Sequence, residues 1–288
     1  MDAARTLTVE GVALRYRLAR SGGAYSPLVL IHGVASNLTR WSEFVEQTAL
    51  KASRDLLRID LRGHGESLTR APAGMERWAD DLAAILDAEG YRGAIVVGHS
   101  LGANLAVHFA ARHPARVVGL VLIDPVLPDA LQGRARWLPR LAPGLRGAIA
   151  VLRVLNRLGL YRRRLPRLDL RRLDEMARAE LLGAGRSQAF VRRYGSPFAD
   201  LEFIPTANYL QDVVELVRPL PQLEAIGAPV LALLSTGITF TDLEATRRLL
   251  AALPGVEIQL VDAYHWPLTE KPVEVRTAIE RWCARLAG

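Results

Sequence analysis

A serine stands between two glycines in the stretch AIVVGHSLGA, residues 94–103. An apolar, β-branched run precedes it, and a stretch with the spacing of an amphipathic helix, Leu101–Arg112, follows it. A turn this tight between a strand and a helix strains its central residue and brings the two backbones together, so Gly98 and Gly102 have to lack side chains. The pattern predicts that Ser100 is a nucleophile. The alternative is that Ser100 only caps the following helix.

Buried strands and amphipathic helices alternate through the first part of the chain and again near its end. This alternation predicts βαβ units and a mostly parallel sheet with helices on both faces. Residues 7–18 alternate between apolar and polar and predict an antiparallel hairpin at the sheet edge. The predicted strands are Leu28–Ile31, Leu56–Ile59, Ile95–Val97, Val117–Ile123, Pro229–Leu234 and Val256–Val261. The predicted helices are Trp78–Glu89, Leu101–Arg112, one from about Asp242 to Leu253 and a last one that ends at Leu286.

The alternation stops after Asp124-Pro125 and resumes at Pro229. We therefore predict one core domain, residues 1–126 and 221–288, and a helical, Arg-rich insertion, residues 127–220. An insertion at this point lies over the carboxyl ends of the strands, where open α/β sheets bind their ligands. The position predicts that the insertion is a lid.

Four motifs follow the predicted strands, and together they carry a resemblance. They are HG at His32-Gly33, DLRGHGES at Asp60–Ser67, GHSLG around Ser100 and HWPLTEKP at His265–Pro272. In these motifs and their order the chain resembles the serine-nucleophile branch of the α/β-hydrolase fold family, which contains esterases and lipases. The resemblance covers residues 28–125 and 229–286. It implies an eight-stranded, mostly parallel sheet with a helical lid inserted after strand 6.

The predicted nucleophile needs a base within hydrogen-bond reach. His265 is the only one of the six histidines that lies beyond the insertion, and it fits the family's chain order of serine, acid and histidine. We predict that His265 is the base; the alternative is a loop histidine with an ordinary structural hydrogen bond. The backbone N–H of Leu101, at a helix N-terminus, would stabilise the oxyanion. The resemblance implies that the second N–H donor is that of Val34.

The acid is the residue that departs from the family pattern. The resemblance implies a small residue, two variable residues and then the acid after the seventh strand. Laid on PVLALLSTGITFTD without gaps, this pattern puts Ile238 in the acid's place. Asp124 ends the sixth strand, close to Ser100 across neighbouring strands, and some family members take their acid there. Asp242 is the alternative, but Thr241 and Glu244 form a capping-box pattern that makes Asp242 a residue of the first helical turn. We predict Asp124 as the acid; Asp242, another residue or none are the alternatives.

The residues predict a hydrolase with a Ser-His-Asp triad. It would cleave a carboxylic ester, thioester or lactone of a small to medium apolar acyl group through an acyl-enzyme. The base and the oxyanion donors supply the catalysis, so we expect neither a metal nor an organic cofactor. Carbon–carbon bond hydrolases and perhydrolases of this fold also use serine and are alternatives. A further alternative is a homologue that binds a ligand without turnover. Ile238 motivates it, because loss of the acid during evolution would leave such a residue at this position.

The positive charge is concentrated in the insertion, which has 17 Arg, no Lys and 9 acidic residues and hence a net charge of +8. No zinc-finger spacing, aromatic RNA-binding motif or basic region with heptads occurs, so we expect no nucleic-acid partner. Residues 144–164 place Ile149, Leu152 and Leu155 at helical spacing with arginines between them. The first interpretation is a lid helix with its apolar face over the active site. The others are weak contact with an anionic membrane through this basic lid, or arginines that bind an anionic group of the substrate.

Composition and cysteine content favour a cytoplasmic protein. Of the 288 residues 50% are hydrophobic and 23% are charged, as in ordinary globular proteins. Residues 1–17 show no signal-peptide pattern, and no apolar stretch reaches the roughly 18 residues that span a bilayer. The single cysteine, Cys283, excludes an internal disulfide and is typical of a reducing compartment. The sequence predicts no particular oligomeric state.

Overall fold

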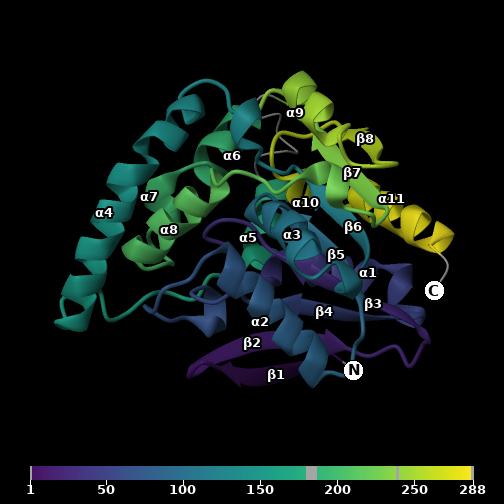
Figure 1. Ribbon diagram of the computed structural model, residues 1–288, viewed down its shortest axis with the longest axis horizontal. Coiled ribbons are helices and arrows are strands. Elements are labelled where there is room, and N and C mark those ends of the chain that lie inside the picture. Colours follow the sequence, from purple (N-terminus) through teal and green to yellow (C-terminus); the bar gives the residue numbers. More distant parts are fainter. Residues whose placement is uncertain (1, 180–186, 238–239, 287–288) are drawn as a thin grey trace.

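An eight-stranded sheet runs through the centre of the protein (Figure 1). The computed structural model describes residues 2–179, 187–237 and 240–286. The strand order is β1-β2-β4-β3-β5-β6-β7-β8; β1 and β2 are antiparallel to their neighbours and the other pairs are parallel. The strands are β1 Asp2–Val9, β2 Val12–Ala19, β3 Tyr25–Ile31, β4 Arg54–Ile59, β5 Ala94–His99, β6 Val117–Ile123, β7 Val230–Ser235 and β8 Glu257–Val261. The predicted mostly parallel sheet with an antiparallel edge hairpin is confirmed.

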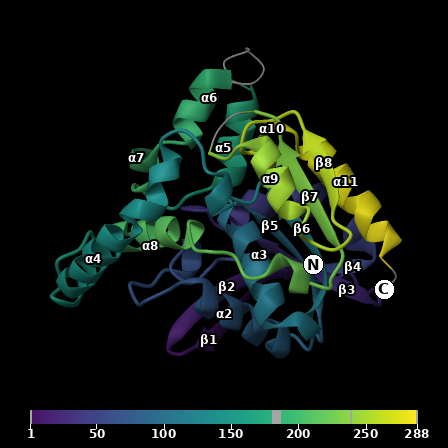
Figure 2. The same cartoon turned by 45° about the horizontal axis from the view of Figure 1, so that its top comes forward.

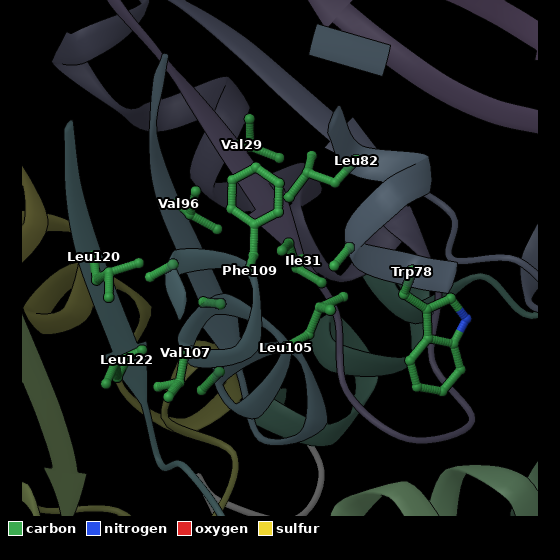
Figure 3. Close-up of a cluster of buried hydrophobic side chains, with 14 of the residues drawn as sticks. Val29, Ile31, Trp78, Leu82, Val96, Leu105, Val107, Phe109, Leu120 and Leu122 are labelled. Atoms are coloured by element: carbon green, nitrogen blue, oxygen red, sulfur yellow. The ribbon is translucent and has the colours of Figure 1, made fainter. Parts of the chain in front are cut away.

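Helices cover both faces of the sheet. On one face α2 (Met75–Ala88), α3 (Leu101–Arg112) and α9 (Leu243–Leu250) pack on a large apolar cluster. Figure 3 shows part of this cluster: Phe109 of α3 and Leu82 of α2 lie close to Val29 and Val96 of the sheet. On the other face α1 (Ser42–Gln47) and α11 (Pro272–Arg285) bury a second cluster, and the short helix α10 (Pro267–Glu270) lies before α11.

The predicted elements lie where the sequence placed them. Strand β6 and helix α3 have the predicted bounds, and the other predicted strands agree with the structure to within a few residues. Apolar runs are fully buried in β3 to β7, as expected for a parallel sheet that is covered on both faces. The carboxyl ends of β3, β5, β6 and β7 therefore meet at one edge, and the loops that follow them form the candidate site.

The segment between β6 and β7 is helical in its described part, which contains no strand. Its helices lie together beside one end of the sheet, with α4 outermost in both views (Figures 1 and 2). They are α4 Leu138–Arg157, α5 Leu170–Ala177, α6 Ser187–Tyr194, α7 Pro197–Asp200 and α8 Thr206–Leu216. Helix α4 packs mainly on α8, with Ile149 buried and Leu152 and Leu155 partly buried. Whether this segment works as a lid stays a prediction.

A buried ion pair joins the insertion to the core. Arg40, in the turn after β3, donates to both carboxylate oxygens of Asp174 in α5 at 2.6 Å. The same guanidinium donates to Thr269 in α10 at 2.7 Å, and Tyr194 of α6 donates to Asp174 at 2.9 Å. Both charged side chains are buried, so loss of either partner would leave an uncompensated charge. This network fixes α5 and α6 beside the loop that carries His265.

Candidate active site

Ser100 lies in the sharp turn between β5 and α3. Its backbone has φ 54° and ψ −119°, a strained conformation for a residue with a side chain. A Cβ on Gly98 would come within 2.1 Å of the Gly102 carbonyl oxygen, and one on Gly102 within 2.5 Å of the Ile31 carbonyl oxygen. The predicted reason for the two glycines is therefore confirmed. Ser100 stands at the N-cap position, but its side chain makes no capping hydrogen bond.

His265 reaches Ser100 from a loop that lies 165 residues further along the chain. The Ser100 hydroxyl donates to Nε2 of His265 at 3.0 Å. Two side chains hold this loop. Glu270 accepts the N–H groups of Tyr264 and Trp266 at 3.1 and 3.2 Å, and the His99 ring donates to the His265 carbonyl oxygen at 2.8 Å. The geometry brings together the two side chains that the sequence predicted as nucleophile and base.

The surroundings of His265 favour its neutral form. Burial lowers the pKa of His265 well below its ordinary value, and the nearby His99 lowers it further. The rings of Phe240 and Trp266 lie 5.0 and 5.6 Å from the imidazole, centroid to centroid, and pack against it edge-on. A neutral imidazole can accept the hydroxyl proton of Ser100, which is what a general base requires.

Asp124 directly follows β6 and points its carboxylate toward the same imidazole. Its Oδ2 lies 4.0 Å from Nδ1 of His265, which is longer than a hydrogen bond. Ser235, at the end of β7, donates its N–H at 2.7 Å and its hydroxyl at 2.5 Å to the two carboxylate oxygens. Burial raises the pKa of Asp124 to about 7, against the lowering effect of these two hydrogen bonds. Asp124 also has a positive φ of 43°, so two neighbouring strands end in strained residues that face the site.

Asp242 has a structural partner instead. It is the N-cap of α9, where its carboxylate accepts the N–H of Ala245 at 2.8 Å. The prediction that Thr241 is the N-cap and Asp242 a helical residue is wrong by one position. The reason is that Thr241 pairs with Leu131 in an isolated bridge and the Asp242 N–H binds the Ala130 carbonyl, so the backbone is still extended there. Residue 238, the isoleucine at the family's usual acid position, lies outside the described residues.

The loop after β3 runs directly against the nucleophile. A Cβ on Gly33 would lie 3.2 Å from the Cβ of Ser100. Val34 follows in this loop, and Leu101 is the first residue of α3, so both predicted oxyanion donors belong to segments that contact Ser100. Their role in catalysis stays a prediction.

A second buried His–Asp pair lies beside this loop, and the sequence did not predict it. Nε2 of His64 donates to Asp212 of α8 at 2.7 Å, and the same oxygen accepts the N–H of Ala35 at 3.3 Å. Burial alone would lower the pKa of His64, but the Asp212 carboxylate outweighs it and the pKa is raised. Ala35 has a positive φ of 47°, so Asp212 holds a strained residue next to Val34. His64 belongs to the DLRGHGES motif, whereas no pattern marks a partner 148 residues away.

The candidate site is largely buried. Ser100 and His265 are only 5% and 6% exposed. A cleft of about 950 Å³ lies beside the loop after β3, where it is lined by Ala35, Ser36 and His64, and Phe203 and Ile204 of the insertion line it from the other side.

Within the described ranges no group of three His, Cys, Asp or Glu side chains could hold a metal ion. No helix in the described part of the chain is both long and apolar enough to cross a membrane.

Two curated proteins are similar to this chain in sequence. The dihydrolipoyllysine-residue acetyltransferase component of the acetoin cleaving system of Cupriavidus necator is 34% identical over 119 residues. That match covers 41% of this chain and 31% of the relative, so the chain spans about a third of that protein's length. The sn-1-specific diacylglycerol lipase ABHD11 of Mus musculus is 23% identical over 276 residues, which are 94% of this chain and 85% of the relative.

Solved structures share the whole fold. The enol-lactonase from Burkholderia xenovorans superposes with a TM-score of 0.70 at 20% identity and covers 98% of this chain and 100% of its own. At this identity the likeness concerns the fold alone. The model of the alpha/beta hydrolase fold matches residues 26–272. Both the motif order and this match agree with the observed sheet, and the chain belongs to the α/β-hydrolase fold family.

Proposed function

We propose that this protein is a serine hydrolase that cleaves a carboxylic ester, thioester or lactone with a small to medium apolar acyl group. Ser100 is the nucleophile, His265 the base and Asp124 the acid. The observation that carries the proposal is the 3.0 Å contact between the Ser100 hydroxyl and Nε2 of a buried, neutral His265. The strained turn at Ser100 and the two close backbone approaches support it, because a structural serine needs neither.

The reaction follows from these positions. The Ser100 oxygen attacks the carbonyl carbon of the ester while His265 takes the hydroxyl proton. The negative charge that forms on the carbonyl oxygen is stabilised by the N–H groups of Val34 and Leu101. His265 then gives its proton to the leaving alcohol, and an acyl-enzyme remains on Ser100. A water molecule, deprotonated by His265, releases the acid and restores the serine.

Asp124 stabilises the charged imidazole in this scheme. When His265 takes a proton, its positive charge favours the ionised form of a carboxylate 4.0 Å away. The same attraction shortens the gap between Nδ1 and Oδ2. The two Ser235 donors already prepare the carboxylate for a negative charge. Asp124 thus acts as a positioning and stabilising group.

An apolar substrate fits the residues around the base. Phe240 and Trp266 pack on His265, and Phe190 and Tyr194 of α6 complete the aromatic cluster. Aromatic surroundings of this kind favour an apolar acyl group over a charged one near the base. The diacylglycerol lipase among the relatives acts, by its name, on an ester of the same general class.

A fluorophosphonate probe tests the nucleophile. We expect the folded wild type to be labelled at Ser100 and Ser100→Ala to show no labelling. The Ser53→Ala variant is the matched control and should keep its label, because the Ser53 hydroxyl donates to the Leu50 carbonyl oxygen and touches none of the proposed catalytic residues. A folded wild type that takes no label would indicate a protein that binds its ligand without turnover.

A panel of p-nitrophenyl esters with increasing acyl length tests the substrate class. We expect turnover that depends on acyl length and is absent in Ser100→Ala. Labelling by the probe without turnover of any ester would instead favour the carbon–carbon bond hydrolases or perhydrolases of the same fold.

A further inference from the structure

Helix α4 turns an apolar side toward solvent. Gly147, Val151, Val154 and the C-cap residue Leu158 follow one another at spacings of four, three and four residues and so share one face. Val151, Val154 and Leu158 are 60%, 52% and 70% exposed. The opposite side of the helix, with Ile149, packs on α8. The helix is therefore apolar on both sides, although only one of them has a neighbour in the described part of the chain.

The same region carries only positive charge. Between residues 130 and 168 there are ten arginines and no Asp or Glu. Arg146 and Arg157 of α4 are exposed beside the apolar face. At the beginning of the helix, Arg136 and Arg140 lie over the ring of Trp137, which is 49% exposed. Below, "the α4 strip" means Trp137, Val151, Val154 and Leu158 with these four arginines.

This combination identifies the chemistry of the partner. A membrane surface offers an apolar interior below anionic headgroups, and an amphipathic helix with arginines beside an apolar face binds there. A second copy of the chain, docked through the same strip, would place the arginines against one another at a cost. Nucleic acid would neutralise the arginines but leave the apolar residues in water. The position also fits, since α4 lies at the outer edge of the molecule in both views (Figures 1 and 2).

We propose that the α4 strip docks on the surface of an anionic lipid bilayer. Val151, Val154 and Leu158 enter the boundary between headgroups and acyl chains, and the arginines bind the headgroup phosphates and carboxylates. The indole of Trp137 lies at the headgroup level, where tryptophan is enriched in membrane proteins. This inference concerns binding and does not depend on the proposed hydrolase function.

Trp137 reports the docking directly. The chain has five tryptophans, and the other four are buried, so a change in emission on vesicle binding arises at Trp137. We expect a blue shift and co-sedimentation with vesicles of phosphatidylcholine that contain about 30 mol% phosphatidylserine, and neither with phosphatidylcholine alone. The shift should be absent in Trp137→Phe, and Ser100→Ala should bind like the wild type. Binding should weaken when the ionic strength is raised, because salt screens the arginines.

Two variants separate the apolar and the charged parts of the strip. Arg146→Gln with Arg157→Gln should weaken binding by about 25-fold, since each arginine near such a surface contributes about five-fold. Val151→Asn, Val154→Asn and Leu158→Asn together should abolish the blue shift. The matched controls lie on other elements, α9, β8 and α11. They are Arg248→Gln with Arg281→Gln, and Leu260→Asn with Val273→Asn, whose side chains are also exposed. The controls should bind like the wild type.

Three results would overturn the proposal. The first is equal binding of the strip variants and the wild type to anionic vesicles, or no binding by either. The second is a concentration-dependent dimer in sedimentation equilibrium that the apolar triple variant abolishes, which would make a second copy the occupant. The third is tight binding of poly-glutamate that needs both halves of the strip, together with no binding to vesicles; this would point to an acidic protein.

Discussion

Asp124 and Asp242 are the two carboxylates that the sequence offers as the acid, and the structure gives them different surroundings. Asp124 faces His265 and holds two hydrogen bonds from Ser235. Asp242 caps a helix. The role of Asp242 is local, and the capping pattern at residues 241–244 indicated it to within one position. The contacts of Asp124 join segments that are far apart in the chain, so no pattern around that residue contains them.

Substitution of each aspartate tests the assignment. Asp124→Asn should lower kcat for an ester by about 10³–10⁴-fold with little change in KM, because the imidazolium loses its anionic partner. Asp242→Ala should leave kcat unchanged and lower the free energy of unfolding by about 1 kcal/mol, the usual cost of a lost N-cap. Ester kinetics and urea unfolding of both variants measure this. If Asp242→Ala is the slow enzyme, Asp124 is not the acid.

Residue types indicated which serine and which histidine would meet, because both lie in motifs with a local pattern. The glycines around Ser100 follow from the steric needs of one turn. The partners of these residues were not predictable in the same way. Ser235 occupies the small-residue position of the family pattern, which gives no indication that its hydroxyl binds Asp124. Asp212 has no motif at all.

Asp212 joins helix α8 of the insertion to the loop after β3. Its carboxylate binds both His64 and the N–H of Ala35, next to the predicted oxyanion donor Val34. Through this contact a helix of the insertion fixes the core loop that carries the predicted oxyanion donor. We infer that Asp212 is a positioning residue rather than a catalytic one.

Asp212→Asn should lower kcat by about 10-fold while KM stays nearly constant. The amide cannot serve as a charged acceptor for both donors, so the Val34 N–H loses its alignment, an effect smaller than the 10²–10³-fold cost of a missing oxyanion donor. Steady-state ester kinetics give both constants. The matched control is Asp81→Asn, which breaks a buried ion pair with Arg62 and should cost stability without a specific effect on kcat. A rise in KM at unchanged kcat would contradict the positioning role.

The sequence predicted the ends of helices and strands well in the core domain, where the strands are buried along their whole length. It predicted them less well in the insertion. Strand β6 is a continuous apolar run and helix α3 has clear helical periodicity, and both begin and end at the predicted residues. Helix α4 begins at Leu138, although Pro143 lies inside it, and a proline in this position argues against a continuous helix. Its solvent-facing apolar side was not predicted either, since periodicity shows an apolar face but not whether a neighbour covers it.

Burial of Asp124 makes the free energy of unfolding of the whole protein depend on pH. Its pKa is raised to about 7 from an ordinary value of 3.8, so the folded protein retains a proton that the unfolded chain releases. Below the pKa of Asp124 in the unfolded chain, this group makes a constant contribution to the free energy of unfolding. The contribution falls as the pH rises from that pKa to the pKa in the folded protein, and above the folded pKa it is constant again.

Asp124→Asn should remove this dependence, because the amide resembles the protonated acid. Relative to the wild type, the variant should gain on the order of 1–3 kcal/mol in unfolding free energy between about pH 5 and about pH 8. Urea unfolding at the two pH values measures the difference, with Asp242→Ala as the control that keeps the wild-type slope. A constant difference between variant and wild type would show that Asp124 is already ionised at pH 5.

The sequence distance between the nucleophile and its base has a consequence during synthesis. His265 is made 165 residues after Ser100, and at about 5–20 residues per second this delay lasts roughly 10–30 s. Throughout that interval the ribosome-bound chain contains the serine turn but no imidazole to activate it. Under the proposed mechanism, each new molecule therefore gains reactivity toward esters only after its last strand and the loop behind it have emerged and folded back.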